Sequence, residues 1–154
     1  AIFNQNPLVI DPGNVSNGIY RSTNGGVTWS RIEGPWGSPL GRIELAGAPS
    51  DPNVLYAGIS STDNPGLLGL YRTDNAWADQ PTWIQIPNQA TGSTGYCARK
   101  CSYSHVISVD PRMADTLYAG GDLDLWRCTS CGVSPTCRYS SRDRAYAVAT
   151  SGAA

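Results

Sequence analysis

The chain has 154 residues, of which 17 are glycine and 11 are proline, and its formal net charge at pH 7 is −1. Frequent glycine and proline argue against a helix-rich fold, and no apolar run approaches the roughly 18 residues that a membrane-spanning helix needs. The near-neutral charge, without a cluster of lysine or arginine, argues against nucleic acid as a partner. The composition therefore predicts an all-β chain without a membrane span.

Three stretches of the chain are similar in sequence, and they indicate the order of its predicted elements. Each contains an aromatic residue followed by arginine, a polar turn and a returning segment: residues 18–29 (GIYRSTNGGVTW), 69–83 (GLYRTDNAWADQPTW) and 124–137 (DLWRCTSCGVSPTC). The aromatic residues Tyr20, Tyr71 and Trp126 lie 51 and 55 residues apart. A repeat of this length predicts one small antiparallel sheet per unit.

A second landmark, the dipeptide Asp-Pro at Asp11, Asp51 and Asp110, predicts the other strands of a unit. An apolar strand is expected to run into it, over residues 44–52 and 105–111. In two units a Leu-Tyr-Ala-Gly strand follows, within residues 54–58 and 116–120. The arginine strand, the polar turn and a strand around the tryptophan complete the unit. Four short strands separated by Gly, Pro, Asn and Asp are typical of a β-propeller blade.

We therefore expect a β-propeller segment of about two and a half to three four-stranded antiparallel blades. The units are expected at 1–43 (incomplete), 44–104 and 105–140, and 141–154 is expected to begin a further unit. A propeller closes with roughly four to eight blades. The expected partners are therefore the remaining blades or other subunits of an assembly. These come from a larger ring, from residues missing from this sequence, or from associating copies.

Five cysteines fall in two groups, and they indicate the compartment. Cys97 with Cys101, and Cys128 with Cys131, are expected to form local disulfides, which persist in oxidising compartments. Cys137 is the cysteine expected to remain. The alternative is a zinc site that uses these cysteines and His105, although the spacing is atypical for structural zinc. We predict no metal site and no cofactor, and an extracellular, periplasmic or cell-surface location in a bacterium.

Residues 22–29 (STNGGVTW) resemble the Asp-box, or BNR repeat, whose pattern is Ser/Thr-x-Asp-x-Gly-x-Thr-Trp. Four residues of the box match, and Asn24 stands where the family has Asp; the matching residues are Ser22, Gly26, Thr28 and Trp29. The second unit keeps Thr73 and Trp83 but inserts residues between them. Sialidases, sortilin-type receptors and xyloglucan-degrading enzymes share this repeat. The resemblance implies a β-propeller in which the box tryptophan packs between neighbouring strands, and it implies no single activity.

Several residues are candidates for a functional site. Arg21, Arg72 and Arg127 occupy equivalent positions and are expected to bond turn carbonyls; the alternative is a carboxylate-binding triad like that of sialidases. Asp122 and Asp124 are a weak candidate for the carboxylate pair of an inverting glycosidase.

The loop 89–105 carries Tyr96 and Tyr103, and the segment 34–39 carries Trp36, which we predict to be exposed for stacking on a partner. His105 is expected to be structural. The sequence favours a non-catalytic binding or scaffold module that recognises a glycan or a protein through such loops. The alternatives are a fragment of a secreted glycoside hydrolase and a structural subunit of an extracellular assembly.

Overall fold

The structure is a computed structural model, and it describes residues 17–37, 39–62, 66–87, 96–97, 99–121, 124–132 and 138–143. These residues form ten strands and no helix, so the chain is all-β, as the sequence predicts. No segment in the described ranges is a helix long and apolar enough to cross a membrane.

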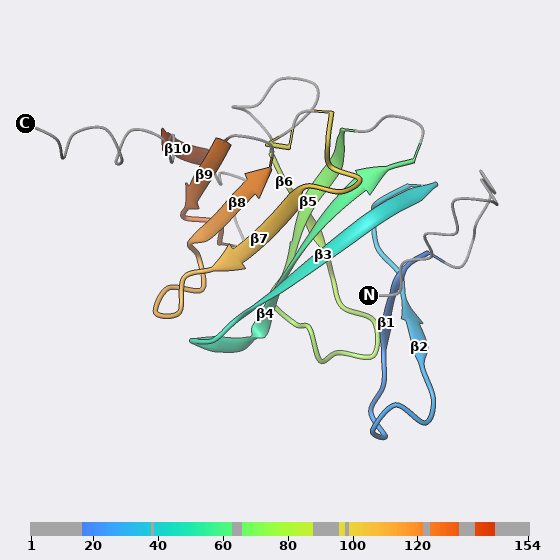
Figure 1. The fold of residues 1–154 in the computed structure, drawn as a ribbon. Coiled ribbons are helices and arrows are strands. Elements are labelled where there is room, and N and C mark those ends of the chain that lie inside the picture. Colours follow the sequence, from blue (N-terminus) through green and yellow to red (C-terminus); the bar gives the residue numbers. More distant parts are fainter. Residues whose placement is uncertain are drawn as a thin grey trace, which may run out of the picture.

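The strands form three antiparallel sheets that follow one another along the chain (Figure 1). The first sheet is the hairpin of β1 (Ile19–Arg21) and β2 (Ser30–Ile32). The second sheet contains β3 (Leu40–Ala48), β4 (Asp51–Ser61), β5 (Leu67–Thr73) and β6 (Ile84–Ile86) in that order. The third sheet contains β7 (His105–Val109), β8 (Leu117–Gly121), β9 (Asp124–Thr129) and β10 (Arg138–Asp143), again as consecutive neighbours.

The second and third sheets pair their strands in the same register. In the second sheet Tyr56 of β4 lies opposite Arg72 of β5, and in the third sheet Tyr118 of β8 lies opposite Arg127 of β9. The sequence repeat therefore corresponds to a structural repeat, in which the paired residues of β4 and β5 have equivalents in β8 and β9.

The second sheet lies between the other two and is buried on both faces (Figure 1). Successive side chains of a strand point to opposite faces, so Tyr56 packs toward the third sheet and Ala57 toward the first. We call the face that carries Arg21, Arg72 or Arg127 the forward face of its sheet, and the opposite face its rear face. The forward faces of the first and second sheets turn toward the following sheet. The third sheet buries its rear-face residues Ile107, Leu117 and Trp126 against the forward face of the second.

Candidate functional site

The turn between β1 and β2 is held by the side chains of the box residues. The Ser22 hydroxyl accepts hydrogen bonds from the backbone N–H groups of Asn24 and Gly26, at 3.3 and 2.8 Å. Asn24 Oδ1 accepts the Thr28 backbone N–H at 2.9 Å, while Asn24 Nδ2 donates to Thr28 Oγ1 at 2.8 Å. Gly26 has φ of 91°, in the left-handed region that favours glycine. Asn24 thus supplies a side-chain acceptor at the position where the Asp-box pattern has Asp.

The second unit builds the same turn across its insertion. The Thr73 hydroxyl donates to Asn75 Oδ1 at 2.7 Å and accepts the Asn75 backbone N–H at 3.3 Å. Asn75 Oδ1 also accepts the backbone N–H of Thr82 at 2.8 Å. Asn75 therefore corresponds to Asn24, an equivalence that the sequence analysis missed. The available signal was its position two residues after Thr73, the spacing of Asn24 from Ser22.

In the third unit a disulfide occupies the place of these hydrogen bonds. Cys128 stands where the other units have Ser22 and Thr73, and it is bonded to Cys131, with the two Cα atoms 6.5 Å apart. The Cys131 backbone N–H donates to the Asp115 carbonyl at 3.0 Å, which ties this turn to the turn between β7 and β8. The covalent bond thus stands where the other two units have a Ser/Thr–Asn contact.

The two box tryptophans lie in different environments. Trp83 is only 7% exposed and meets the ring of Trp36 edge-on, with ring centroids 5.3 Å apart. Trp29 is 56% exposed, and its indole Nε1 donates to the Gly26 carbonyl at 3.0 Å. The expectation that the box tryptophan packs between strands is therefore wrong for Trp29, because no described residue covers its ring as Trp36 covers that of Trp83.

Two of the three equivalent arginines reach from the forward face of their sheet to the following sheet. Arg21 donates through Nη1 to the carbonyls of Ala76 and Ala78, at 3.1 and 2.6 Å. Both carbonyls belong to the turn between β5 and β6, so Arg21 bonds turn carbonyls as the sequence predicts. These contacts connect the first sheet to the second.

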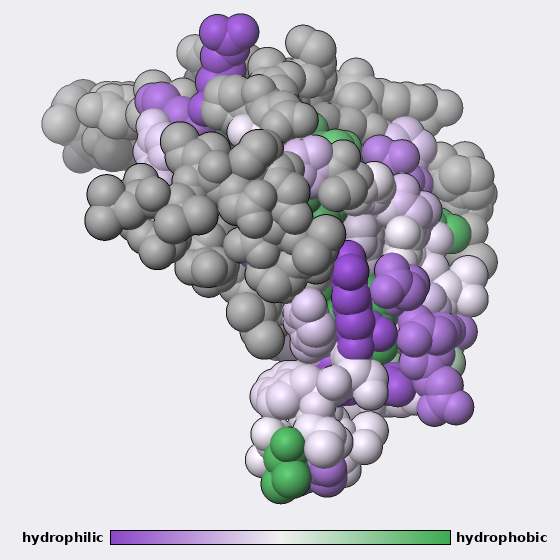
Figure 2. Space-filling model, turned by 90° about the vertical axis from the view of Figure 1, so that its right-hand side faces the viewer, coloured by the Kyte–Doolittle hydropathy of each residue, from purple (hydrophilic) through white to green (hydrophobic). Residues whose placement is uncertain are grey.

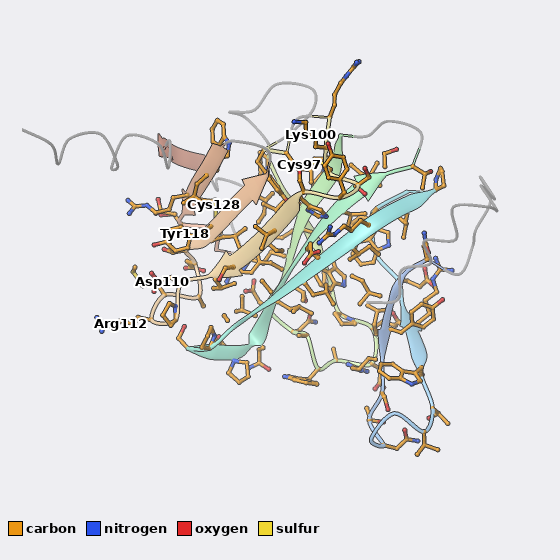
Figure 3. The ribbon with its side chains drawn as sticks, viewed as in Figure 1. Cys97, Lys100, Asp110, Arg112, Tyr118 and Cys128 are labelled. Carbon is orange, nitrogen blue, oxygen red and sulfur yellow. A yellow bond between two sulfur atoms is a disulfide. The ribbon has the colours of Figure 1, made fainter. Side chains whose placement is uncertain are left out.

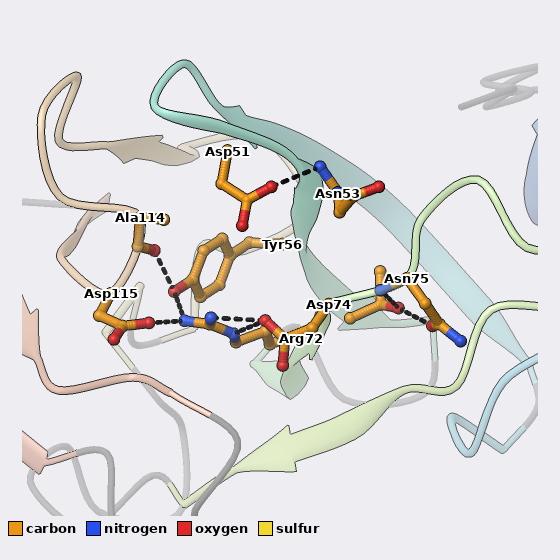
Figure 4. Close-up of polar contacts among 9 residues, drawn as sticks. Asp51, Asn53, Tyr56, Arg72, Asp74, Asn75, Ala114 and Asp115 are labelled. Atoms are coloured by element: carbon orange, nitrogen blue, oxygen red, sulfur yellow. Dashed lines mark hydrogen bonds and ion pairs between the residues drawn. The ribbon is translucent and has the colours of Figure 1, made fainter.

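Arg72 forms a polar network between the second and third sheets (Figure 4). Its side chain is 5% exposed and forms ion pairs with Asp74 and Asp115, each at 2.5 Å. Arg72 Nη1 also donates to the Tyr56 hydroxyl at 2.6 Å, and that hydroxyl donates to the Ala114 carbonyl at 2.7 Å. Burial raises the pKa of Tyr56 to about 12 despite the opposing effect of Arg72. The phenol therefore stays protonated and remains a donor.

This network borders an open cleft of about 910 Å³ that is lined by residues of the second and third sheets. Its lining carries both signs of charge and includes Asp51, Arg72, Asp115, Tyr118, Arg127 and Ser130. The structure places Arg72 and Arg127 at this cleft, whereas Arg21 bonds carbonyls of a different turn. The three arginines are thus not brought together at one site, and the carboxylate triad is not formed.

The turn that precedes β7 is closed by a disulfide and presents one aromatic side chain. Cys97 and Cys101 are bonded, with Cα atoms 5.0 Å apart. Tyr103 is 62% exposed, and its carbonyl accepts Arg42 Nη1 at 2.7 Å. Arg42 is fixed in turn by Glu44, at 2.5 Å. We call residues 96–104 the stapled turn; Figure 3 shows its Lys100 extending away from the sheets.

The other two predicted binding aromatics point inward. Trp36 is 4% exposed because it lies across the rear face of the second sheet, against Tyr71 and Trp83. Tyr96 is 2% exposed, and its hydroxyl lies 2.9 Å from Nδ1 of His105. The prediction that these two side chains are presented at the surface is therefore wrong, since both fold back over a sheet and fill its core.

His105 begins β7 and is 1% exposed. Burial lowers its pKa to about 4, and nearby Glu44 only partly offsets this effect. The imidazole is therefore neutral at pH 7. The cysteines proposed as zinc ligands form disulfides, and the described part of the chain holds no group of three metal-binding side chains. Asp122, the Asp124 side chain and Cys137 lie outside the described residues.

No protein-family model matches this chain, and no curated protein and no solved structure is significantly similar to it.

Proposed function

We propose that this chain is a segment of an Asp-box β-propeller and serves as a non-catalytic binding and scaffold module, extracellular or at the cell surface. Two observations support the propeller. Each four-stranded sheet connects its strands in consecutive antiparallel order, as a propeller blade does. The sheets also stack in chain order, with forward face against rear face, and the two four-stranded sheets share one register.

The stapled turn is the proposed contact surface. The single observation that carries this assignment is the contrast between its two tyrosines: Tyr96 anchors the turn in the core, and Tyr103 stands 62% exposed. The disulfide and the Arg42 contact hold the backbone around Tyr103 in place. A tyrosine presented on a fixed backbone offers a rigid, amphipathic contact area and loses little conformational entropy on binding. Such a ring suits the flat face of a sugar, so a glycan is the proposed ligand.

Affinity electrophoresis in gels that contain xyloglucan, β-glucan, chitosan or pectin tests this function. We expect at least one polysaccharide to retard the protein, and Tyr103→Ala to remove the retardation. Trp77→Ala is the matched control, because Trp77 is similarly exposed at 65% but lies in the turn between β5 and β6. Retardation that survives in Tyr103→Ala, or none with any polysaccharide, would contradict the glycan site. Release of reducing sugar from a retarding polysaccharide would contradict a non-catalytic role.

A further inference from the structure

The forward face of the third sheet is exposed where its equivalent in the second sheet is buried. Leu125 is 38% exposed, whereas its equivalent Leu70 is 1% exposed. Arg127 is exposed, whereas its equivalent Arg72 is 4% exposed. Val106 on β7 adds a further exposed apolar side chain to this face, at 57%. The second sheet shows what covers such a face: the rear face of another sheet.

The rear face of the first sheet, at the opposite end of the stack, is also more exposed than its equivalent in the second sheet. Trp29 is 56% exposed, and its equivalent Trp83 is 7% exposed beneath Trp36, which belongs to the preceding unit. Tyr20 is half-buried, and its equivalent Tyr71 is 3% exposed. In Figure 1 the hairpin that carries these residues lies at this end of the stack and extends below it, and Figure 2 views the molecule from this end. Among the described residues, Trp29 therefore lacks the covering that Trp36 gives to Trp83.

The forward face of the third sheet and the rear face of the first sheet are complementary, because one carries an arginine donor and the other belongs to a sheet with a turn that offers carbonyl acceptors. Inside the chain, the Arg21 guanidinium crosses from a forward face to the carbonyls of the turn between β5 and β6. The turn between β1 and β2 is the equivalent of that turn in the first unit. A first sheet placed on the third sheet would therefore offer its turn carbonyls to Arg127, and the apolar side chains of the two faces would cover each other.

We propose that the forward face of the third sheet binds the rear face of the first sheet of a second copy of this chain, so that copies associate head to tail. The inference rests on the repeat stack of the proposed function and not on glycan binding. The contact is heterologous, because different surfaces of the two copies meet, so it closes into a ring or extends the stack. Leu125 and Trp29 are its expected central apolar contacts, and Arg127 is its directional polar contact.

Sedimentation velocity over a concentration series tests the association with the whole chain. We expect the unmodified protein to form dimers or larger species. Leu125→Glu on the forward face and Trp29→Ser on the rear face should each lower the association constant more than about tenfold. Val106→Lys is a second forward-face variant in case Leu125→Glu fails to fold. Trp77→Ser is the control, because Trp77 is 65% exposed in the turn between β5 and β6 and belongs to neither face.

Mixing the two defective variants tests the head-to-tail arrangement. The Leu125→Glu protein keeps an intact rear face and the Trp29→Ser protein keeps an intact forward face. Each alone should remain monomeric, and an equimolar mixture should form a one-to-one dimer that grows no further. An unmodified protein that stays monomeric throughout the concentration series would overturn the proposal, and so would a mixture that fails to associate. Both results are independent of the gel assay, so a failed glycan site and a failed assembly are distinguishable.

Discussion

Replacing His105 by glutamine should remove a specific acid sensitivity of this fold. His105 lies at the interface of the second and third sheets, with its Nδ1 beside the Tyr96 hydroxyl. Its Nε2 is buried as well. The charged groups near it are Glu44, which favours the protonated ring, and Arg42, which opposes it. Burial outweighs both, so the native ring resists protonation.

The size of the effect follows from the difference between the folded and unfolded pKa values. In the unfolded chain the imidazole takes up a proton below its ordinary pKa of 6.5, whereas in the folded protein it stays neutral down to about pH 4. The unfolded state therefore binds more protons in this window, and the free energy of unfolding falls as the pH is lowered through it. At about 1.4 kcal/mol per pH unit, the loss amounts to about 3 kcal/mol.

Urea unfolding monitored by tryptophan fluorescence, at several values between about pH 7 and pH 4, measures this loss. His105→Gln lowers the free energy of unfolding at pH 7, because it disturbs the contact with Tyr96. It should then lose about 3 kcal/mol less than the unmodified protein on acidification. Both proteins carry the same carboxylates, so the difference between their pH profiles isolates the histidine. Parallel profiles would refute the assignment of a buried, neutral imidazole.

Three further predictions concern the contacts that fix the sheets and turns, each measured as a free energy of unfolding by urea denaturation. Arg72→Met should lower the free energy of unfolding by about 2–3 kcal/mol, since the partner carboxylates are part-exposed and regain water. Arg127→Met should lower it by under about 0.5 kcal/mol in the monomer. Equal losses would contradict the inter-sheet role of Arg72. Asn24→Ala should cost about 1 kcal/mol through loss of the turn acceptor, and Asn24→Asp should be nearly neutral, so a similar loss in both would point away from that acceptor. Replacing Cys97 and Cys101 together by serine should cost about 2 kcal/mol by the loop-closure entropy of a short loop, and no change would show that Arg42 alone fixes the turn.

The strand order could be predicted because each strand carries its own local signal. The Leu-Tyr-Ala-Gly segments lie in β4 and β8, and the aromatic-Arg segments lie in β1, β5 and β9. Local patterns of this kind need no knowledge of the neighbouring sheet. The first sheet is a hairpin of short strands, which agrees with the missing Leu-Tyr-Ala-Gly segment in the first unit.

The candidate site was less predictable because it depends on contacts between units. Trp36 stands among glycine and proline and therefore resembles an exposed loop residue, but the rear face of the second sheet supplies an apolar surface that buries it. The ion pair of Arg72 with Asp115 joins residues 43 positions apart, and no spacing rule connects them. The sequence grouped Tyr96 with Tyr103 in one loop, yet the hydrogen bond to His105 turns only Tyr96 inward.

Arginines that contact the following unit allow the chain to gain whole units by duplication. Arg21 and Arg72 each contact the unit that comes after them, Arg21 at the turn between β5 and β6 and Arg72 at the turn between β7 and β8. A tandem duplication of residues 72–126, the period between the matching points Tyr71 and Trp126, would reproduce Arg72 together with its partner Asp115. Gene duplication can therefore lengthen this protein without new compensating substitutions, whereas an insertion out of phase with the period would separate each arginine from its receiving turn.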